Sequence, residues 1–377
     1  MKRKLKKIEK MFICLLKYIY YFILCKVKRI NNDSVWLIAE RGNDARDNSY
    51  HFYKYIKENH KNINIKYVMD KKSSDAKKID NNDIVEYGSK EHYLYFLTAS
   101  KLISTHIMGY SPDMSIFWRL DKLGLLKLKG KKIMLQHGIT QNYLEFMSSK
   151  IAKLDLFICG AYPEYQYILE NYGYTEKEVK YTGFARYDKL KNKEKNQILV
   201  MPTFRKWLNY TDDFSKSEYF KKWNEILNQK ELLQYLEEKD LELIFYPHYE
   251  IQKYLDNFSS SSERIIIASF NNYDVQKLLI ESKILITDYS SVFFDFAYMR
   301  KPVIYYQFDI DKFRSEHYKQ GFFDYEKMGF GPVCKTKKDV TKALKNIDTV
   351  KNKNISEFFK YSDFNNCRRI YEEIIKL

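Results

Sequence analysis

Short apolar runs recur along the chain from residue 34 to residue 308, and polar or amphipathic stretches separate them. Runs of this kind that end in polar turns are typical of buried parallel strands, with helices between them. The expected strands of the first half are SVWLIAE (34–40), IKYVM (65–69), DIVEYG (83–88), KLISTHI (101–107), KIMLQHG (132–138), DLFICG (155–160) and VKYTG (179–183). Those of the second half are QILVMPT (197–203), LELIFYPH (241–248), RIIIAS (264–269), KILITD (283–288) and PVIYYQF (302–308). The pattern predicts an α/β fold with parallel sheets.

The chain divides between these two sets of strands. The lysine-rich stretch KLKNKEKNQ (189–197) has no apolar periodicity and is the best candidate for a linker. We expect an N-terminal Rossmann-like domain over 34–190, a C-terminal Rossmann-like domain over 191–345, and a helical segment over 346–377 that can cross back. Two doubly wound domains that face each other across a cleft make the GT-B architecture. No G-x-G-x-x-G follows the first strand, which disfavours a dinucleotide-dependent oxidoreductase.

Residues 1–33 form a basic, amphipathic N-terminal arm. Its apolar residues from Met11 to Cys25 follow helical spacing, and Lys17 interrupts them. As a helix this stretch would be roughly 22 Å long, shorter than the about 30 Å of a bilayer core, and no small-residue cleavage site follows it. We predict a helix that lies on an anionic membrane surface through residues 1–30, peripherally at the cytoplasmic face. The alternative is a buried amphipathic helix packed on the first domain.

The distribution of charge narrows the possible partners. The net charge is +16, and +9 of it falls on the first 30 residues. The rest of the chain has only a mild excess of positive charge, which argues against nucleic acid as a partner. The five cysteines are scattered without a C-x-x-C pair, so neither a disulfide framework nor a zinc site is indicated, and a reducing compartment is expected.

The run ILITDYSSVFFDFAYMRKPVIYY (284–306) carries the strongest chemical signal. A buried strand ends in a polar turn, and apolar residues at helical spacing follow directly. Ser290 and Ser291 lie where the free backbone N–H groups of a helix start point outward, so the turn is suited to bind an anion. A plain helix cap by Ser290 is the alternative. Asp288 can hold the loop through backbone N–H groups or contact the ribose or an acceptor, and we favour the first because a carboxylate repels phosphate.

This run and its continuation, FDIDKFRSEHYKQGFFDYEKMGFGPV (308–333), resemble the signature of the CDP-glycerol glycerophosphotransferases, which prime or polymerise teichoic acid. The resemblance covers residues 34–345 and is strongest over 281–332. It implies a GT-B fold, CDP-glycerol as donor, and a lipid-linked glycan or polyol-phosphate acceptor. In length the chain resembles the short, primase-type members, or relatives that decorate capsular polysaccharide with glycerol phosphate.

The sequence QHG (136–138) ends an expected strand and presents an imidazole there. A histidine suits the removal of a hydroxyl proton because its pKa lies near working pH, and we expect Gly138 to allow an unusual backbone turn. A lone histidine at a strand end is more often structural than catalytic. QHGIT resembles the family's Q-x-x-H-G-T element, with Thr140 one position later than usual. The resemblance implies that His137 is the catalytic base.

Two further strand ends resemble family elements that contact the donor. PTFR (202–205) resembles the P-T-x-R element, in which a guanidinium at Arg205 would bind phosphate oxygens in a bidentate manner. A surface salt bridge is the alternative for Arg205, and Thr203 joins the same substrate-binding set. YPH (246–248) reverses the family's H-P order. The resemblance implies that His248 contacts the nucleotide diphosphate in catalysis, as a hydrogen-bond donor or a cation.

The sequence RDN (46–48) follows the first expected strand, where the family has a D-N pair. Asp47 and Asn48 are expected to shape the acceptor side of the substrate site or, equally, to cap the next helix. The remaining histidines show no partner pattern, and we interpret them as ordinary residues: His51, His60, His92, His106 and His317.

Together these elements predict a transferase that moves glycerol phosphate from CDP-glycerol to an acceptor hydroxyl and releases CMP. His137 would take the proton as the oxygen attacks the β-phosphorus, while Arg205, His248, Ser290 and Ser291 stabilise the phosphoryl charge. No D-x-D pair is placed as a metal clamp, so we predict that neither a metal nor another cofactor takes part. The alternatives are CDP-ribitol or a nucleotide sugar as donor, and a membrane-associated binding protein that has lost catalysis.

Overall fold

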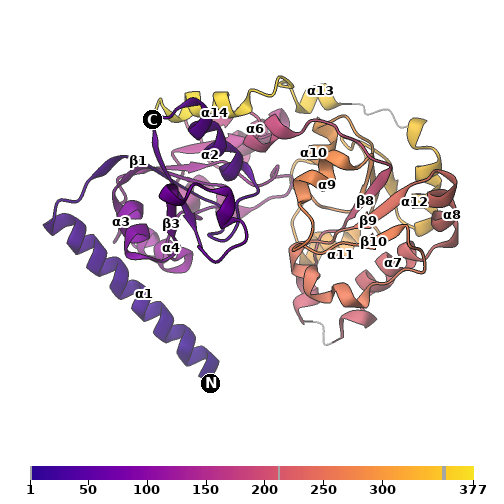
Figure 1. Cartoon of the computed structure of the whole chain (residues 1–377), viewed down its shortest axis with the longest axis horizontal. Coiled ribbons are helices and arrows are strands. Elements are labelled where there is room, and N and C mark those ends of the chain that lie inside the picture. Colours follow the sequence, from indigo (N-terminus) through magenta and orange to yellow (C-terminus); the bar gives the residue numbers. More distant parts are fainter. Residues whose placement is uncertain (1, 211–212, 350–353) are drawn as a thin grey trace. The chain divides into compact units, whose positions relative to one another are not determined.

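The computed structural model describes residues 2–210, 213–349 and 354–377, and the chain forms two compact units (Figure 1). Unit 1 contains Met1–His137, Glu145–Asp188 and Asp363–Leu377, and unit 2 contains Gly138–Leu144 and Lys189–Ser362. The change of unit after Asp188 lies beside the boundary expected at residue 190. The short segment Gly138–Leu144 was not expected to belong with the second half of the chain.

In the described part of unit 1, parallel strands form one sheet in the order β3-β2-β1-β4-β5-β6-β7. The strands are β1 (Asn32–Ala39), β2 (Asn64–Met69), β3 (Ile84–Glu86), β4 (Ala99–Ser104), β5 (Lys131–Met134), β6 (Leu156–Cys159) and β7 (Val179–Tyr181). The helices are α1 (Lys2–Val27), α2 (Asn48–Asn59), α3 (Lys90–Thr98), α4 (Met114–Lys122), α5 (Ser149–Ala152), α6 (Tyr162–Asn171) and α14 (Asn366–Ile374). Val35–Ala39 of β1 are buried on both faces, as expected for a sheet that helices cover on both sides.

Helix α1 packs against unit 1 with one face. It contacts α3 and α4, Tyr18 is buried, and the Tyr18 hydroxyl donates to the carbonyl of Asp113 (3.1 Å) just before α4. The Tyr21 ring stacks on Tyr93 of α3, with ring centroids 5.0 Å apart. The side chains of residues 2–8 and 10, which carry most of the basic groups expected in the arm, lie outside the described part of the chain. Among the described residues, no helix combines the length and the apolar content needed to span a bilayer.

In the described part of unit 2, parallel strands form a second sheet in the order β10-β9-β8-β11-β12-β13. The strands are β8 (Gln197–Met201), β9 (Glu242–Phe245), β10 (Ile265–Ile267), β11 (Ile284–Thr287), β12 (Val303–Tyr306) and β13 (Val333–Cys334). The helices are α7 (Glu218–Leu227), α8 (Lys230–Glu238), α9 (Val275–Glu281), α10 (Phe293–Tyr298), α11 (Ile310–Glu316), α12 (Lys337–Lys345) and α13 (Ile355–Phe358). Trp223 of α7 is fully buried in the core that these helices make with the sheet.

Each sheet reverses its strand order once, between β1 and β4 in unit 1 and between β8 and β11 in unit 2. Ligands of doubly wound sheets bind outside the carboxyl ends of the strands at this switch point. The predicted site residues follow β1 and β5 in unit 1, and β8, β9 and β11 in unit 2.

The end of the chain returns to unit 1. The Asp188 carboxylate accepts the backbone N–H groups of Asn366 (2.8 Å) and Cys367 (2.9 Å) at the start of α14. The segment 346–377 is therefore divided: Asp363–Leu377 belongs to unit 1, whereas the part up to Ser362 belongs to unit 2.

Candidate active site

His137 lies just after β5 in unit 1, and its side chain is exposed. The preceding residue, Gln136, has a φ of 58°, in the left-handed region that costs a non-glycine residue about 1 kcal/mol or more. Gln136 Nε2 donates to the carbonyl of Ile158 (2.8 Å) and to Glu164 Oε1 (3.0 Å), and these buried bonds hold the turn. The unusual backbone expected at Gly138 therefore falls on Gln136 instead.

His106, which the sequence did not single out, stacks on His137. The two rings are nearly parallel, at 6°, with centroids 4.6 Å apart. Arg41 Nε donates to His106 Nε2 (3.3 Å), so the neutral ring carries its proton on Nδ1, which lies 2.9 Å from Thr105 Oγ1. Burial, and then the charges of His137 and Arg41, lower the pKa of His106 well below its ordinary value. A neutral ring fixes the plane of His137 without adding a second charge to it.

Asp47 and Asn48 hold the backbone at His137. Asn48 is fully buried; its Nδ2 donates to the carbonyl of Gln136 (2.7 Å), and its Oδ1 accepts the N–H of Arg186 (3.0 Å). Asp47 caps α2 and pairs with Arg186 (3.0 Å), whose guanidinium also donates to the carbonyl of His137 (3.1 Å). Asn48 thus holds the turn at His137 and Asp47 caps α2, while a role of either residue on the acceptor side of the substrate site stays a prediction.

Glu40, at the end of β1, organises the same turn and was also not predicted. Its buried carboxylate accepts the backbone N–H groups of Arg46 (3.0 Å), Asp47 (2.8 Å) and Tyr50 (3.1 Å). Burial and the nearby Asp47 raise the pKa of Glu40 to about 8, and the three N–H groups oppose that shift. Dinucleotide-binding folds have a glycine-rich turn at this place. Here the Glu40 carboxylate accepts the backbone N–H groups before and at the start of α2.

In unit 2, Asp288 holds the turn that follows β11, as the loop-holding interpretation predicts. It is fully buried, and its Oδ1 accepts the N–H groups of Thr203 (2.8 Å) and Tyr289 (2.6 Å). Its Oδ2 lies 2.9 Å from the Arg205 guanidinium. Burial raises the pKa of Asp288, whereas Arg205 and the two N–H groups lower it. We assign an ionised carboxylate, because Oδ1 accepts two backbone N–H groups and Oδ2 lies beside the positive charge of Arg205.

Arg205, the predicted phosphate ligand, is buried in a cluster of ion pairs. Its guanidinium is fully buried; Nε and Nη2 donate to the two oxygens of Asp309 (2.8 and 3.0 Å), and Nη1 donates to the carbonyl of Thr203 (2.7 Å). Nη2 also pairs with Asp288. The two carboxylates raise the pKa of Arg205 above its ordinary value although burial lowers it. Protein groups engage the donors of Arg205, which thereby holds the turns after β8 and β11 together; a contact with phosphate stays a prediction.

The hydroxyl groups at the strand ends have different surroundings. Ser290 and Ser291 are partly exposed, and the residue that caps α10 is Val292, with no side-chain cap. The bond from the Val292 N–H to Ser290 Oγ is long, at 3.5 Å, so the capping alternative for Ser290 receives little support. Thr203 Oγ1 is buried and has no hydrogen-bond partner among the described residues. These hydroxyls retain the capacity to bind an anion.

His248 lies after β9 and stacks on Phe204, with ring centroids 4.7 Å apart. Its Nδ1 accepts the N–H of Glu250 (3.2 Å). A neutral imidazole that accepts at Nδ1 carries its proton on Nε2, so His248 presents a donor at that atom. This tautomer suits the predicted contact with a phosphate oxygen.

The segment Gly138–Leu144 packs on the turn after β11 within unit 2. A Cβ on Gly138 would lie 2.5 Å from Ser291 Oγ, so the Ser291 hydroxyl would have to move before a side chain could stand at position 138. Gln141 is buried; its Nε2 donates to the carbonyl of Tyr289 (2.6 Å), and its Oε1 accepts the Tyr325 hydroxyl (3.1 Å). Gly138 is thus needed for close packing rather than for its backbone angles.

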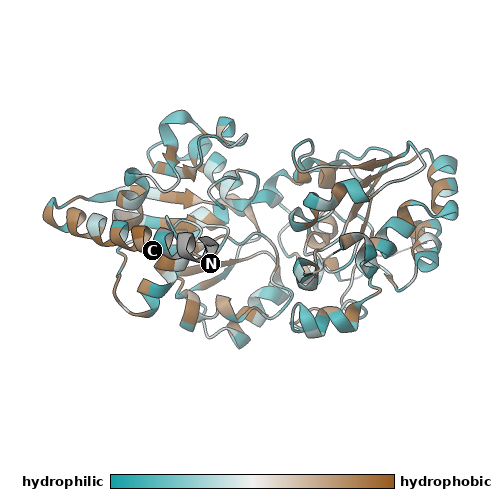
Figure 2. Ribbon diagram, turned by 90° about the horizontal axis from the view of Figure 1, so that it is seen from below, coloured by the Kyte–Doolittle hydropathy of each residue, from teal (hydrophilic) through white to brown (hydrophobic). Residues whose placement is uncertain are grey.

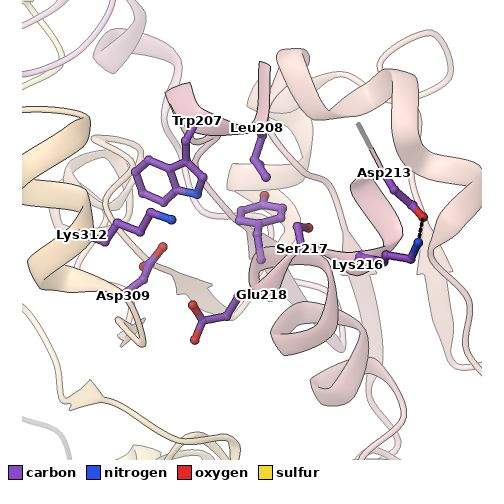
Figure 3. Close-up of a pocket in the computed structure, with 9 residues that line it drawn as sticks. Trp207, Leu208, Asp213, Lys216, Ser217, Glu218, Asp309 and Lys312 are labelled. Atoms are coloured by element: carbon purple, nitrogen blue, oxygen red, sulfur yellow. Dashed lines mark ion pairs between the residues drawn. The ribbon is translucent and has the colours of Figure 1, made fainter. Parts of the chain in front are cut away.

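A pocket of about 220 Å³ opens beside Asp309 on unit 2 (Figure 3). It lies between the loop after β8 and the start of α11, and Figure 3 shows Trp207, Lys312 and Asp309 on one side of it. The Lys312 ammonium lies 4.9 Å from the Trp207 ring centroid. The pocket shares Asp309 with the Arg205 cluster.

Among the described residues, no group of three or more histidine, cysteine, aspartate or glutamate side chains is placed to hold a metal ion. Asp309 pairs with Arg205. In the Asp309-Ile310-Asp311 stretch, only Asp311 therefore has a carboxylate that this ion pair does not use. Independence from metals stays a prediction.

The chain matches a model of a known protein family. A family model described as CDP-Glycerol:Poly(glycerophosphate) glycerophosphotransferase matches residues 19–376. The chain belongs to this glycerophosphotransferase family. The match spans both units, and the site residues described in this subsection lie within it.

Two curated relatives and one solved structure illustrate the likeness. The minor teichoic acid biosynthesis protein GgaB of Bacillus subtilis is 34% identical over 92% of this chain, which spans 40% of GgaB. The teichoic acid glycerol-phosphate transferase of Staphylococcus aureus is 24% identical over 92% of this chain and 94% of its own length. The wall teichoic acid polymerase TagF, in a structure soaked with CDPG, has a TM-score of 0.73 at 18% identity, with 100% of this chain and 96% of that chain covered. The likeness to TagF shows a GT-B-like fold.

Proposed function

We propose that this chain transfers glycerol phosphate from CDP-glycerol to a hydroxyl of a membrane-linked glycan or teichoic acid precursor and releases CMP. The observation that carries the proposal is the exposed His137 imidazole, held by a stacked, neutral His106 in a member of the glycerophosphotransferase family. Such a base is what an acceptor hydroxyl needs before it can attack phosphorus.

In the proposed reaction the acceptor oxygen attacks the β-phosphorus of the donor in line. A new oxygen–phosphorus bond forms, the bond to the CMP oxygen breaks, and the hydroxyl proton passes to His137. Ser290, Ser291, Thr203 and the Nε2–H of His248 donate to the phosphoryl oxygens as negative charge develops on them. Arg205 supports these donors indirectly in this proposal. It pairs with Asp288, which holds the turn that carries the two serines.

We also propose that unit 1 docks on an anionic membrane surface at the cytoplasmic face. The outer face of α1 leaves large apolar side chains exposed, including Phe12 (59%), Leu16 (49%) and Ile23 (53%), and Figure 2 shows hydrophobic residues along this helix. Next to α1, Trp118 of α4 and Leu123 are also exposed. Exposed basic residues accompany both helices: Lys17, Lys26, Lys28, Arg29, Arg119, Lys122 and Lys127. Apolar wedges beside basic groups are typical of interfacial helices.

Vesicle flotation tests the membrane proposal. Wild-type protein should float with phosphatidylglycerol vesicles, less well with phosphatidylcholine, and less at high salt. Leu16→Glu should abolish flotation, whereas Leu125→Glu tests whether the segment after α4 also inserts. Equal recovery of wild type and Leu16→Glu with both vesicles would contradict docking through α1.

The activity is tested by CMP release from CDP-glycerol, CDP-ribitol and UDP-glucose, each with a detergent-solubilised lipid-linked acceptor. We expect release from CDP-glycerol and its loss, by about 10²-fold or more, in His137→Ala. The matched control is His60→Ala, because His60 also stacks on an aromatic ring of unit 1, that of Tyr371 (3.7 Å), but lies at the far end of α2. Release from CDP-ribitol alone would change the donor, and an active His137→Ala variant would remove the base from the proposal.

A further inference from the structure

Arg314 differs from Arg46, Arg186 and Arg205 in having no carboxylate partner among the described residues. It lies on α11, partly buried, and its Nη1 donates to Asn142 Oδ1 (2.6 Å). Its Nε is buried without a hydrogen-bond partner among the described residues, and no carboxylate within that part of the chain forms an ion pair with it. A buried cation without an anion is unfavourable unless a ligand supplies the negative charge.

The surroundings of Arg314 confirm that its charge is unmatched. Burial lowers its pKa, and the groups that oppose this are the neutral phenols of Tyr325 and Tyr289 rather than carboxylates. Arg205, on the same sheet, has two carboxylates for one guanidinium. In unit 2, carboxylates therefore engage the guanidinium of Arg205, whereas no described carboxylate engages that of Arg314.

Arg314 is tied to the turn that carries the two serines. Its partner Asn142 belongs to the segment Gly138–Leu144, whose Gly138 packs on Ser291 and whose Gln141 bonds the carbonyl of Tyr289. Asn142 is four residues from Gly138, a span of at most about 14 Å. Tyr289, which directly precedes the serines, is close enough to act on the pKa of Arg314.

We infer that Arg314, and not Arg205, supplies the guanidinium that binds phosphoryl oxygens at the Ser290–Ser291 turn. Asn142 fixes Nη1 of the guanidinium, and Nη2, for which the described residues provide no partner, is left for a charge-assisted contact with a phosphoryl oxygen. The inference rests on the proposed function only for the identity of the ligand. The phosphoryl group can belong to the donor's diphosphate or to the terminal phosphate of the acceptor.

The test is calorimetric titration of full-length protein with inorganic pyrophosphate, CDP and glycerol 3-phosphate. The variants are Arg314→Gln and Arg314→Lys, with Arg264→Gln as the matched control. Arg264 is another arginine of unit 2, but it precedes β10 at the opposite edge of the sheet and pairs with Asp240 on the surface. The melting temperature of each ligand-free variant is measured in parallel.

We expect Arg314→Gln to weaken pyrophosphate and CDP binding by about 10- to 100-fold, because a charge-assisted hydrogen bond is lost. Arg314→Lys should fall between it and wild type, since a lysine keeps the charge but not the fork. The ligand-free melting temperature of Arg314→Gln should be unchanged or higher, because an uncompensated cation is removed. Arg264→Gln should behave as wild type.

Several results would overturn the inference. They are wild-type affinity of Arg314→Gln for all three anions, a fall in its melting temperature that accompanies the loss of binding, or the absence of pyrophosphate and CDP binding by the wild type. An effect on glycerol 3-phosphate alone would assign Arg314 to the acceptor phosphate. Arg314-dependent binding of pyrophosphate and CDP, without turnover of CDP-glycerol, would retain the anion site and reject the proposed function.

Discussion

Replacing Arg205 by glutamine separates the structural role of this residue from the ligand role that its motif suggests. The guanidinium is fully buried and donates to both oxygens of Asp309, while its Nη2 pairs with Asp288. The Arg205→Gln variant removes the positive charge and leaves two carboxylates buried side by side. The variant therefore perturbs the folded state before any ligand is present.

The size of the effect follows from the burial of the cluster. Removing one partner of a buried ion pair costs about 3–5 kcal/mol, because the remaining charge is uncompensated. Asp288 and Asp309 raise the pKa of Arg205 despite its burial, which indicates that the charged form is the stable one. For a domain of 150–250 residues, each kcal/mol corresponds to about 2–4 °C in melting temperature. We expect the transition of unit 2 to fall by roughly 6–20 °C.

Differential scanning calorimetry of ligand-free protein measures this shift. Arg264→Gln provides the control, since its pair with Asp240 is exposed and surface pairs contribute about 0–1 kcal/mol. Adding Asp309→Asn to Arg205→Gln should restore part of the loss, because only one buried carboxylate then remains without a cation. A single Arg205→Gln variant that melts within about 1 °C of wild type but no longer binds CDP would refute the reasoning and return Arg205 to the phosphate site.

Three further variants test unit 1 and the Gly138 packing. His106→Ala should lower kcat by about 10- to 100-fold and leave the Kd for CDP unchanged, since only the orientation of His137 is lost; unchanged kcat would contradict this. His92 is fully buried, with its pKa lowered to about 4 by burial, so the unfolded chain binds the extra proton as the pH falls below 6.5. Wild type should therefore lose about 2 kcal/mol between pH 8 and pH 5 in urea titrations, and His92→Gln should lack this component of the pH dependence. Gly138→Ala should weaken CDP binding and lower kcat together by about 10²-fold, because its Cβ would meet Ser291 at 2.5 Å, whereas Gly124→Ala, in open space, should retain both.

Every strand except the two-residue β13 was predictable, because buried parallel strands leave a recognisable apolar pattern. Asp288 was assigned its loop-holding role for an electrostatic reason that needs no coordinates, and the backbone N–H groups of Thr203 and Tyr289 fill it as that argument requires. The two serines were placed at the same turn by the change from strand to helix spacing.

Other features could not be read from the chain because they depend on which strands become neighbours. His106 follows β4 and His137 follows β5, and only the pairing of these strands brings the two rings together. Glu40 closes its loop through backbone donors, which leave no pattern in the side chains. The left-handed backbone at Gln136 could not be predicted either, because the glycine two positions later is the residue expected to adopt it.

Protein groups already use the hydrogen-bonding capacity of some of the predicted site residues. Arg205 is one example. The strand-end motif predicts where Arg205 lies in the sheet, but its guanidinium donates to Asp309, which comes 104 residues later in the chain. Arg314 and Thr203 show the opposite condition, with buried polar atoms that no described group satisfies. Because unsatisfied buried donors are unfavourable in the empty protein, they mark the positions where a ligand adds stability when it binds. Thr203 and Arg314 meet this criterion in unit 2, and the ion pairs of Arg205 with Asp288 and Asp309 hold the turn that follows β11.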